Sequence, residues 1–132
     1  MNALLLLWQL PQVLLGLLLR LFYPAVYRLE QDGVTVIFSD RFHGGLSLGT
    51  TVFVHSHVYV WNEYPLDTLT VRHELGHCKQ SQILGWFYLL VIGLPSVLHA
   101  WLYRRDPSDP DGYYRFYTEA WADRLAGITR QQ

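Results

Sequence analysis

The sequence predicts a single α+β domain over residues 1–132, and three observations lead to this fold class. A chain of 132 residues has the length of one domain. Strand-like patterning is confined to residues 26–60, whereas helical patterning lies on both sides of that stretch. Charged side chains are almost absent from residues 1–27 and 80–103, which favours a membrane-associated protein over an ordinary water-soluble one.

Composition limits the classes of partner. The net charge is −1 and there is no basic run, so the sequence argues against nucleic-acid binding. Cys78 is the single cysteine, which excludes a disulfide within one chain and leaves the redox compartment open. The sequence also leaves open whether the chain forms a homo-oligomer.

Residues 1–24 are predicted to contain a membrane helix, because residues 3–22 form an apolar run of the length that crosses a bilayer. A cleaved signal peptide fits less well, since no basic residue precedes the run and no small-x-small cleavage site follows it. A hydrophobic helix buried against another chain is the other alternative. Arg20 and Arg28 follow the apolar core of the run, so the positive-inside rule places the rest of the chain on the cytoplasmic side.

The following stretch predicts three or four antiparallel strands. The segment VYRLEQDGVTVIFSD reads as two strands joined at Asp32-Gly33, which is a strong hairpin signal. GGLSLGTTVFVHSHVYV continues with a β-branched and aromatic run. His55 and His57 alternate there and would share one sheet face, with His43 nearby in sequence. A second metal site is one interpretation, but a polar strand face beside a cleft is the favoured one.

Helical patterning resumes after residue 62. Asp67 or Thr68 can cap a helix that runs to about Leu84. An apolar segment over residues 83–102 follows, and a last helix from about Tyr113 ends at Gly127, a residue suited to a C-cap.

The first of these helices carries the segment VRHELGHCKQ. His73 and His77 are four residues apart, so they lie on one helix face and can bind the same metal ion. Glu74 lies about 100° round the helix from His73, within reach of a water on that metal. This is the H-E-x-x-H arrangement, in which the glutamate is the general base. The alternative is a helix on which two histidines share a face by chance.

A catalytic zinc ion requires a third protein ligand, for which His99, Glu119 and Asp123 are the downstream candidates. Glu119 and Asp123 are again four residues apart in YTEAWADRLAG, so they share one face of the last helix. One carboxylate can bind the metal while the other accepts the free N–H of a ligand histidine.

The two motifs together resemble those of the gluzincin metallopeptidases. The string EAWADRLA is similar to the E-x-x-A-D-R-x-A segment of integral-membrane gluzincins of the HtpX and CAAX-prenyl-protease type. The stretches SLGTTVFVH, HELGHCKQSQILG, VIGLPS and YTEAWADRLAG also resemble small bacterial membrane proteins with this motif pair. The resemblance covers residues 46–127, and the chain is far shorter than the larger membrane gluzincins.

This resemblance implies one Zn²⁺ ion held by His73, His77 and Glu119, with Glu74 as catalytic base and Asp123 as the partner of His73. The oxyanion-stabilising residue of such families has no clear counterpart in this chain. The candidates for it are Tyr113, Tyr114, His99 and Arg124. By the same resemblance, an edge strand before the motif helix would hold an extended substrate. The residues expected in it are Gly49, Thr50, Thr51, Val52, Phe53, Val54 and His55.

The ligand set has a consequence for the segment over residues 83–102. A straight membrane-crossing helix there would separate His77 from Glu119 on opposite sides of the bilayer. The segment is therefore expected to form a re-entrant or interfacial helical hairpin that reverses at residues 93–96. An ordinary buried core segment is the alternative.

The sequence thus predicts a zinc-dependent, membrane-associated endopeptidase with a zincin-like catalytic unit over residues 25–132. The expected partners are membrane lipid and a polypeptide substrate, such as a membrane protein or a hydrophobic peptide. The main alternative is a non-catalytic membrane protein that has a structural zinc site and acts as an assembly or interaction factor. A toxin-like or immunity-like membrane peptide with a vestigial motif is a third hypothesis.

Overall fold

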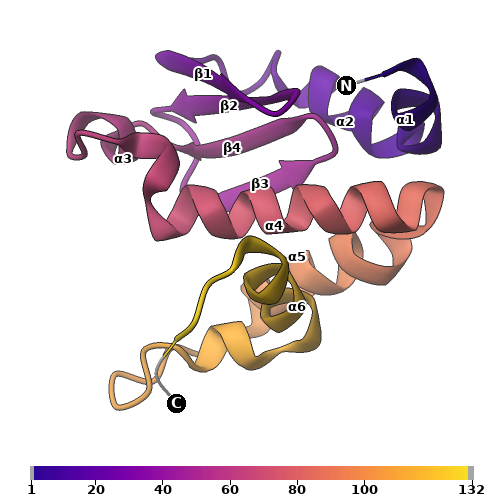
Figure 1. Ribbon diagram of the computed structural model, residues 1–132. Helices are drawn as coiled ribbons and strands as arrows, with labels where there is room; N and C mark the ends of the chain where they lie inside the picture. The colour runs from indigo at the N-terminus through magenta and orange to yellow at the C-terminus, as the bar shows by residue number, and fades with distance from the viewer. Residues whose placement is uncertain (1, 131–132) are drawn as a thin grey trace.

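The computed structural model describes residues 2–130, so residues 1, 131 and 132 of the predicted domain lie outside the described chain. The described residues form six α-helices and a small mixed sheet (Figure 1). The α-helices are α1 (Ala3–Trp8), α2 (Leu10–Leu19), α3 (His57–Val60), α4 (Leu69–Leu84), α5 (Leu94–Leu102) and α6 (Tyr117–Ala126). The strands are β1 (Tyr27–Gln31), β2 (Val34–Ser39), β3 (Gly45–Leu48) and β4 (Thr51–His55). The predicted α+β class is confirmed.

Helix α4 is the central layer of the molecule. The sheet lies on one side of it, and α5 and α6 lie on the other (Figure 1). Thr68 caps the helix, with its Oγ1 atom accepting a hydrogen bond from the backbone N–H of Val71 at 3.4 Å. The predicted start and end of the motif helix are therefore confirmed, and both histidines of the motif lie in its middle.

The sheet has the order β1-β2-β4-β3 and is mixed, so the prediction of a wholly antiparallel sheet is wrong. The hairpin between β1 and β2 turns at Asp32 and Gly33, as expected, with φ angles of 53° and 80°. The chain then forms the edge strand β3 and returns as β4, which inserts between β3 and β2. Strand β4 therefore runs antiparallel to β3 and parallel to β2. Hairpin signals specify sequential neighbours and carry no information on this insertion.

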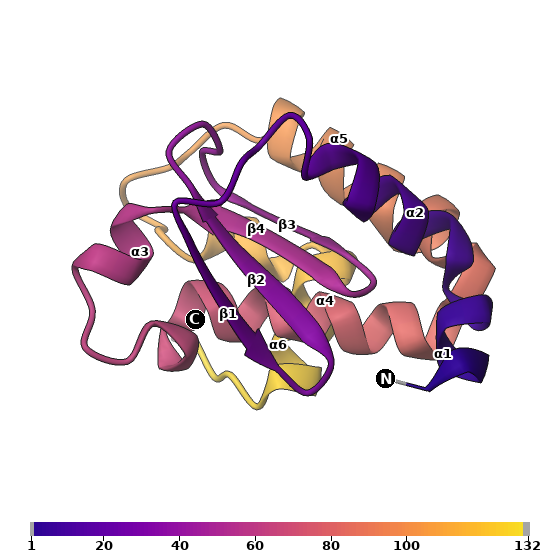
Figure 2. The same ribbon diagram turned by 90° about the horizontal axis from the view of Figure 1, so that it is seen from above.

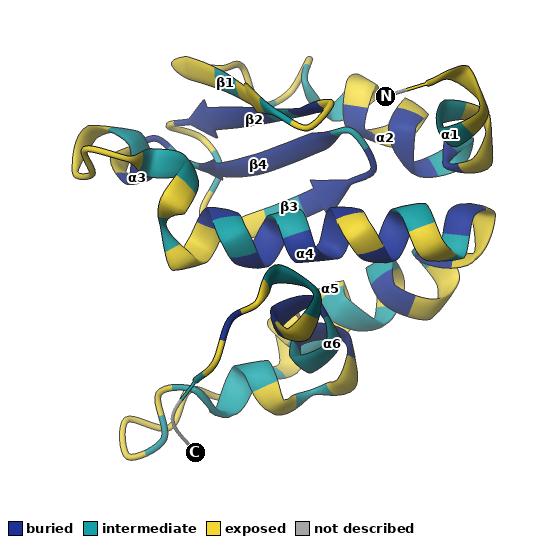
Figure 3. Cartoon of the chain, in the orientation of Figure 1, coloured by how far each residue is buried: buried dark blue, intermediate teal, exposed yellow. Residues whose placement is uncertain are grey.

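The main core lies between the sheet and α4. Figure 3 shows β2 and β4 as almost wholly buried, whereas β1 is largely exposed. Val36, Phe38, Val52 and Val54 pack in one cluster with Val71 of α4. Cys78 belongs to the same cluster and is a buried packing residue.

The predicted membrane helix over residues 3–22 is divided into α1 and α2. Gln9 leaves helical geometry between them, at φ −110° and ψ 16°, and Pro11 in the first turn of α2 lacks a backbone donor. Gln9 and Gln12 are fully buried and both bind the Ser81 hydroxyl of α4. These polar contacts fix the N-terminal helices against α4. Within residues 2–130, no helix has the length and apolar character needed to cross a membrane.

The segment over residues 83–102 does not reverse at residues 93–96, and this expectation is wrong. Gly93 and Leu94 both have right-handed helical dihedrals, so the π-helical turn Leu89–Gly93 continues directly into α5. The reversal occurs at Gly85, whose φ is 56°. A Cβ atom at Gly85 would come within 2.1 Å of the Trp8 indole, so both the turn and the close contact require glycine. The chain therefore reverses between α4 and α5, and α5 runs back at an angle to α4 rather than directly beneath it (Figure 1 and Figure 2).

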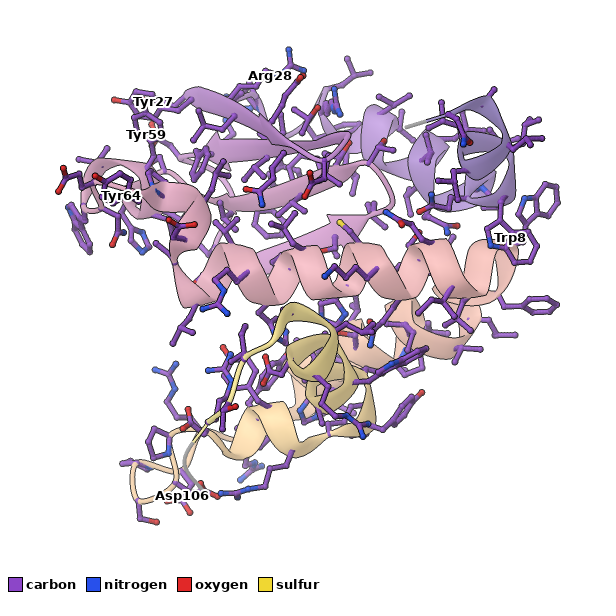
Figure 4. All side chains as sticks on the ribbon, viewed as in Figure 1. Trp8, Tyr27, Arg28, Tyr59, Tyr64 and Asp106 are labelled. Atoms are coloured by element: carbon purple, nitrogen blue, oxygen red, sulfur yellow. The ribbon has the colours of Figure 1, made fainter. Side chains whose placement is uncertain are left out.

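Aromatic side chains fix both ends of the sheet-and-helix unit (Figure 4). Tyr27 of β1 stacks on Tyr59 of α3, with ring centroids 4.0 Å apart and planes within 8°. At the other end, the Trp8 indole N–H donates to the backbone carbonyl of Gln82 at 2.9 Å. Helix α6 begins at Tyr117, later than predicted, because residues Gly112–Arg115 form a 3-10 turn. It ends at Gly127 with a φ of 70°, as expected for this C-cap.

Candidate metal centre

Two helices bring the three predicted metal ligands together. His73 and His77 on α4 face Glu119 on α6, and one donor atom from each lies within 4.8 Å of the other two. Glu119 Oε1 is 3.4 Å from His73 Nε2 and 3.1 Å from His77 Nε2. All three residues are buried. Two imidazole nitrogens and one carboxylate oxygen therefore converge, although Glu119 lies 46 residues after His73 and 42 residues after His77 in the sequence.

The close approach of α4 and α6 depends on Gly76. A Cβ atom at this position would lie 2.1 Å from the backbone carbonyl oxygen of Ala122, far inside van der Waals contact. Gly76 lies between the two ligand histidines, and Ala122 lies between Glu119 and Asp123. The glycine thus sets the helix separation at which the carboxylate reaches the imidazoles.

His73 has a carboxylate partner on its second nitrogen. Asp123 Oδ1 lies 2.7 Å from His73 Nδ1, in the position that the sequence assigned to it. Arg130 donates to Asp123 Oδ2 at 2.7 Å, and its guanidinium lies 3.5 Å from the centroid of the Tyr114 ring. A hydrogen bond at Nδ1 fixes the imidazole tautomer and leaves the Nε2 lone pair free for a metal.

His77 has an equivalent partner that sequence reasoning missed. Gln80 Oε1 lies 2.6 Å from His77 Nδ1, and Gln80 Nε2 donates to the Thr118 carbonyl of α6 at 2.8 Å. Gln80 is fully buried. The sequence does contain a signal for this contact, because Gln80 lies three residues after His77 and residues three apart are neighbours on a helix surface.

Glu119 is held on its other oxygen as well. Ser96 of α5 donates its hydroxyl to Glu119 Oε2 at 3.0 Å, and the Thr118 hydroxyl contacts the same oxygen. Ser96 belongs to the apolar segment before α6, so α5 contributes directly to the orientation of the third ligand. Oε1 is left to face both histidines.

Glu74 is buried beside the cluster but is not part of it. The Ser47 hydroxyl of β3 lies 2.9 Å from Glu74 Oε1 and 2.7 Å from the Glu74 carbonyl oxygen. A Cβ atom at Gly45 would come within 2.6 Å of Glu74 Oε2, so the strand passes directly over the carboxylate. Glu74 and the three ligand residues line the same cavity.

The charges of the metal-free cluster are strongly coupled. Burial lowers the pKa of His77, but its hydrogen bond with Glu119 and the charge of Glu74 outweigh this and raise the pKa to about 9. The pKa of His73 is also raised, against the effect of burial, by Glu119, Glu74 and Asp123. Burial raises the pKa of Glu119, yet its bonds to both histidines bring that pKa well below the ordinary value. A proton thus occupies the space between imidazole and carboxylate that a cation would fill.

The structure separates the four oxyanion-stabilising candidates. Tyr113 and Tyr114 line the cavity with the ligands, and burial raises the pKa of both phenols. His99 lies outside the cavity lining, where it stacks between the Tyr113 and Phe116 rings and donates to the Tyr113 carbonyl at 2.8 Å. Arg124 is exposed on α6. Tyr113 and Tyr114 are therefore the two candidates that face the cluster's cavity.

The predicted substrate strand is not at an edge. Strand β4 lies between β2 and β3, and residues Thr51–Val54 are buried, so its backbone cannot pair with a further chain. The edge beside α4 is β3, whose residues line the cavity. Its Ser47 carbonyl already accepts the Tyr88 hydroxyl at 2.9 Å. The expectation that residues 49–55 form an edge strand is wrong, and the edge strand at the cavity is Gly45–Leu48.

The cavity has a volume of about 930 Å³. Helix α2 contributes Leu15 and Leu19 to its wall, and α5 contributes Leu94, Val97 and Ala100. Both helices also expose apolar side chains to the outside. The exposed residues on α2, α5 and the turns before α5 include Leu14, Leu17, Leu18, Trp86, Phe87, Leu90, Leu98, Trp101 and Leu102.

A scan against models of protein families, a search among curated proteins and a search among solved structures each found no match for this chain. The resemblance to gluzincins therefore rests on the motif residues alone. The fold and the geometry of the buried cluster stand independently of it.

Proposed function

We propose that this chain is a zinc-dependent endopeptidase that acts on apolar polypeptides at a membrane surface. The observation that supports this most strongly is the convergence of His73, His77 and Glu119 at one buried point beside Glu74. The cluster offers three protein ligands and faces a large cavity, as a catalytic metal site requires. A structural zinc site would instead be closed by a fourth protein ligand.

The donor set favours zinc. Two imidazole nitrogens and one carboxylate suit this borderline ion, whereas magnesium and calcium prefer oxygen ligands alone. Asp123 and Gln80 hold the outer nitrogens of the two histidines, as partners of metal ligands do. His73, His77 and Glu119 would hold such a zinc ion, which would supply Lewis-acid polarisation of a carbonyl and activation of water for attack.

Glu74 is the proposed general base. Its carboxylate accepts a proton from the attacking water and delivers that proton to the leaving amine. The hydroxyl of the water joins the new carboxyl terminus, and its proton joins the new amino terminus. The Ser47 hydroxyl fixes Oε1 of Glu74 and leaves Oε2 to carry the proton. The Tyr113 hydroxyl is the proposed donor to the oxyanion that develops on the scissile carbonyl, since it lines the cavity and stays protonated over the working pH range.

The substrate is proposed to pair as an added strand with the accessible start of β3, at Gly45 and Leu46. Strand β3 is the edge of the sheet nearest the cluster. Residues two apart in a strand direct their backbone N–H and C=O groups to the same edge, so those of Gly45 point the same way as the Ser47 carbonyl. An extended chain paired with Gly45 would lie over Glu74, because that glycine touches its carboxylate. The leucine and valine walls from α2 and α5 favour apolar side chains.

Membrane lipid is the proposed second partner. Exposed apolar side chains of α2 and α5 surround the cavity that holds the cluster, and large exposed apolar surfaces mark interaction sites. Trp86 and Trp101 are exposed among them, and tryptophan is enriched at membrane interfaces. An apolar substrate could then reach the cavity without leaving the interface.

The test is cleavage of an extended apolar polypeptide by the zinc-loaded protein in lipid vesicles. Glu74→Gln should lower turnover by about 10²–10⁴-fold, the contribution of a general base, while zinc content stays unchanged. Glu63→Gln, at a glutamate exposed on a loop, is the matched control and should cleave like the wild type. Stoichiometric zinc without cleavage by the wild type would favour the structural-site alternative, and an active Glu74→Gln variant would remove the base assignment.

A further inference from the structure

A second group of imidazoles lies outside the ligand cluster. His55 ends β4 and His57 begins α3, so the prediction that these two residues share one face of a strand is wrong. His43 precedes β3 in a loop. The His55 and His57 ring centroids are 4.6 Å apart, and those of His43 and His55 are 5.1 Å apart. All three line the same cavity as the buried cluster. We call this group the histidine triad.

Two nitrogens of the triad point at each other. His55 Nδ1 and His57 Nδ1 are 2.6 Å apart, a separation at which one proton must lie between the two nitrogens. His55 Nδ1 also accepts the backbone N–H of His57 at 3.1 Å, so it is the nitrogen that carries a lone pair. His57 Nδ1 is therefore the donor and His55 Nδ1 the acceptor, and the two nitrogens face each other across one proton.

A divalent metal ion can replace that proton with little movement. Metal–imidazole bonds of about 2.0–2.1 Å at a tetrahedral angle place the two nitrogens about 3.4 Å apart. The rings would therefore separate by less than about 1 Å. His57 is exposed, so its side chain can shift and water can replace its backbone hydrogen bond.

The residues around the paired histidines include one carboxylate and a third imidazole. The Asp40 carboxylate contacts the hydroxyl of Ser56, the residue between the two paired histidines. His43 stacks on the His55 ring and is followed by Gly44, where an added Cβ atom would meet open space. Rotation of the His43 side chain can supply a third imidazole. Three neutral imidazoles suit copper, nickel and zinc ions.

We propose that the histidine triad is a second binding site for a divalent transition metal, at a different place in the cavity from the buried cluster. It differs from that cluster in chemistry, because it offers imidazoles alone and is partly exposed to solvent. It should therefore bind more weakly than the buried ligands and take Cu²⁺ in preference to Zn²⁺. The proposal does not depend on peptidase activity.

The test is the number of metal ions bound per chain, measured by elemental analysis after titration with Cu²⁺ of protein preloaded with Zn²⁺. The wild type should hold about two ions per chain and His55→Gln/His57→Gln about one, namely the buried zinc ion. His99→Gln removes a histidine outside both groups and should keep both ions. Electron paramagnetic resonance of the bound Cu²⁺ should show coupling to two or three nitrogens, and the double variant should lose this signal.

Thermal unfolding of each variant separates loss of the site from loss of the fold. Wild-type protein that takes up no Cu²⁺ beyond its zinc would overturn the proposal, as would a folded double variant that retains the nitrogen-coupled signal. The buried site is tested separately by His73→Gln/His77→Gln. If the buried cluster binds no metal but the histidine triad does, the wild type and His73→Gln/His77→Gln should each hold one ion, and His55→Gln/His57→Gln should hold none.

Discussion

Asp123 Oδ1 lies 2.7 Å from His73 Nδ1, and Arg130 holds the other carboxylate oxygen of Asp123 at 2.7 Å. The aspartate thus links a ligand imidazole to a fixed cation. We propose that Asp123 orients His73 and does not itself bind the metal. This link leads to the first prediction.

Asp123→Asn keeps the size of the side chain but removes the charge that fixes the His73 tautomer. Zinc affinity should fall by about 10–100-fold, the usual effect of losing the carboxylate partner of a ligand histidine. Competition with a chromogenic chelator measures it. Asp106→Asn, in an exposed loop (Figure 4), is the matched control and should bind zinc like the wild type. Unchanged affinity in Asp123→Asn would contradict the assignment.

Gly76→Ala should separate α4 from α6. The new Cβ atom would lie 2.1 Å from the Ala122 carbonyl oxygen, so backbone must move, at a cost of about 1–3 kcal/mol. The Tm of the metal-free protein should fall by several degrees, and zinc affinity should fall with it because Glu119 moves away. Gly93→Ala is the control, since the nearest atom to its Cβ atom would be on the flexible Leu89 side chain at 3.3 Å, with Tyr88 atoms in ordinary contact at 3.7 and 3.8 Å. Equal Tm values for the two variants would refute this packing argument.

The metal-free protein should lose stability as the pH rises from about 6.5 to 9. The pKa of His77 is raised to about 9, against an unfolded value of about 6.5. The folded state therefore binds this proton more tightly, so the stabilisation is complete below pH 6.5 and is lost as the pH rises through 9. Urea unfolding at several pH values measures the effect. His77→Gln should flatten the dependence, and an equally steep profile in that variant would assign it to other groups.

Zinc-loaded protein should partition onto lipid vesicles through the apolar surface of α2 and α5. Replacing Trp101 with serine should lower vesicle binding in a sedimentation assay without lowering the Tm, because this side chain is 80% exposed. Trp61→Ser removes a tryptophan that is 77% exposed and follows α3 rather than lying on α5, and it serves as the control. Equal loss in both would show that the surface around the cavity has no special role.

Local signals in the sequence were sufficient for the elements that carry the site. Asp32-Gly33 specified a hairpin, Thr68 capped α4 and Gly127 ended α6, since each needs only its neighbours in the chain. The spacing of four residues placed His73 with His77, and Glu119 with Asp123, on single helix faces. Their convergence on one point was inferred from chemistry, because a metal ion requires a third ligand.

The errors arose where distant segments decide the structure. Gln9 and Gln12 lie within the apolar run, and both are buried against Ser81, about 70 residues away, where the run divides into two helices. The chain reverses at Gly85 rather than at residues 93–96, because Trp8 packs against the glycine. The insertion of β4 between β2 and β3 likewise depends on the whole sheet. None of these contacts is visible in local patterning.

The central claim is that Glu119 binds the same metal ion as His73 and His77. X-ray absorption spectroscopy of the zinc-loaded protein, in wild type and in Glu119→Gln, tests it most directly. The wild-type spectrum should fit two imidazole nitrogens plus oxygen ligands at about 2.0–2.2 Å, and Glu119→Gln should bind zinc at least about tenfold more weakly with an altered first shell. An identical spectrum and affinity in Glu119→Gln, or no zinc bound by the wild type, would contradict the account.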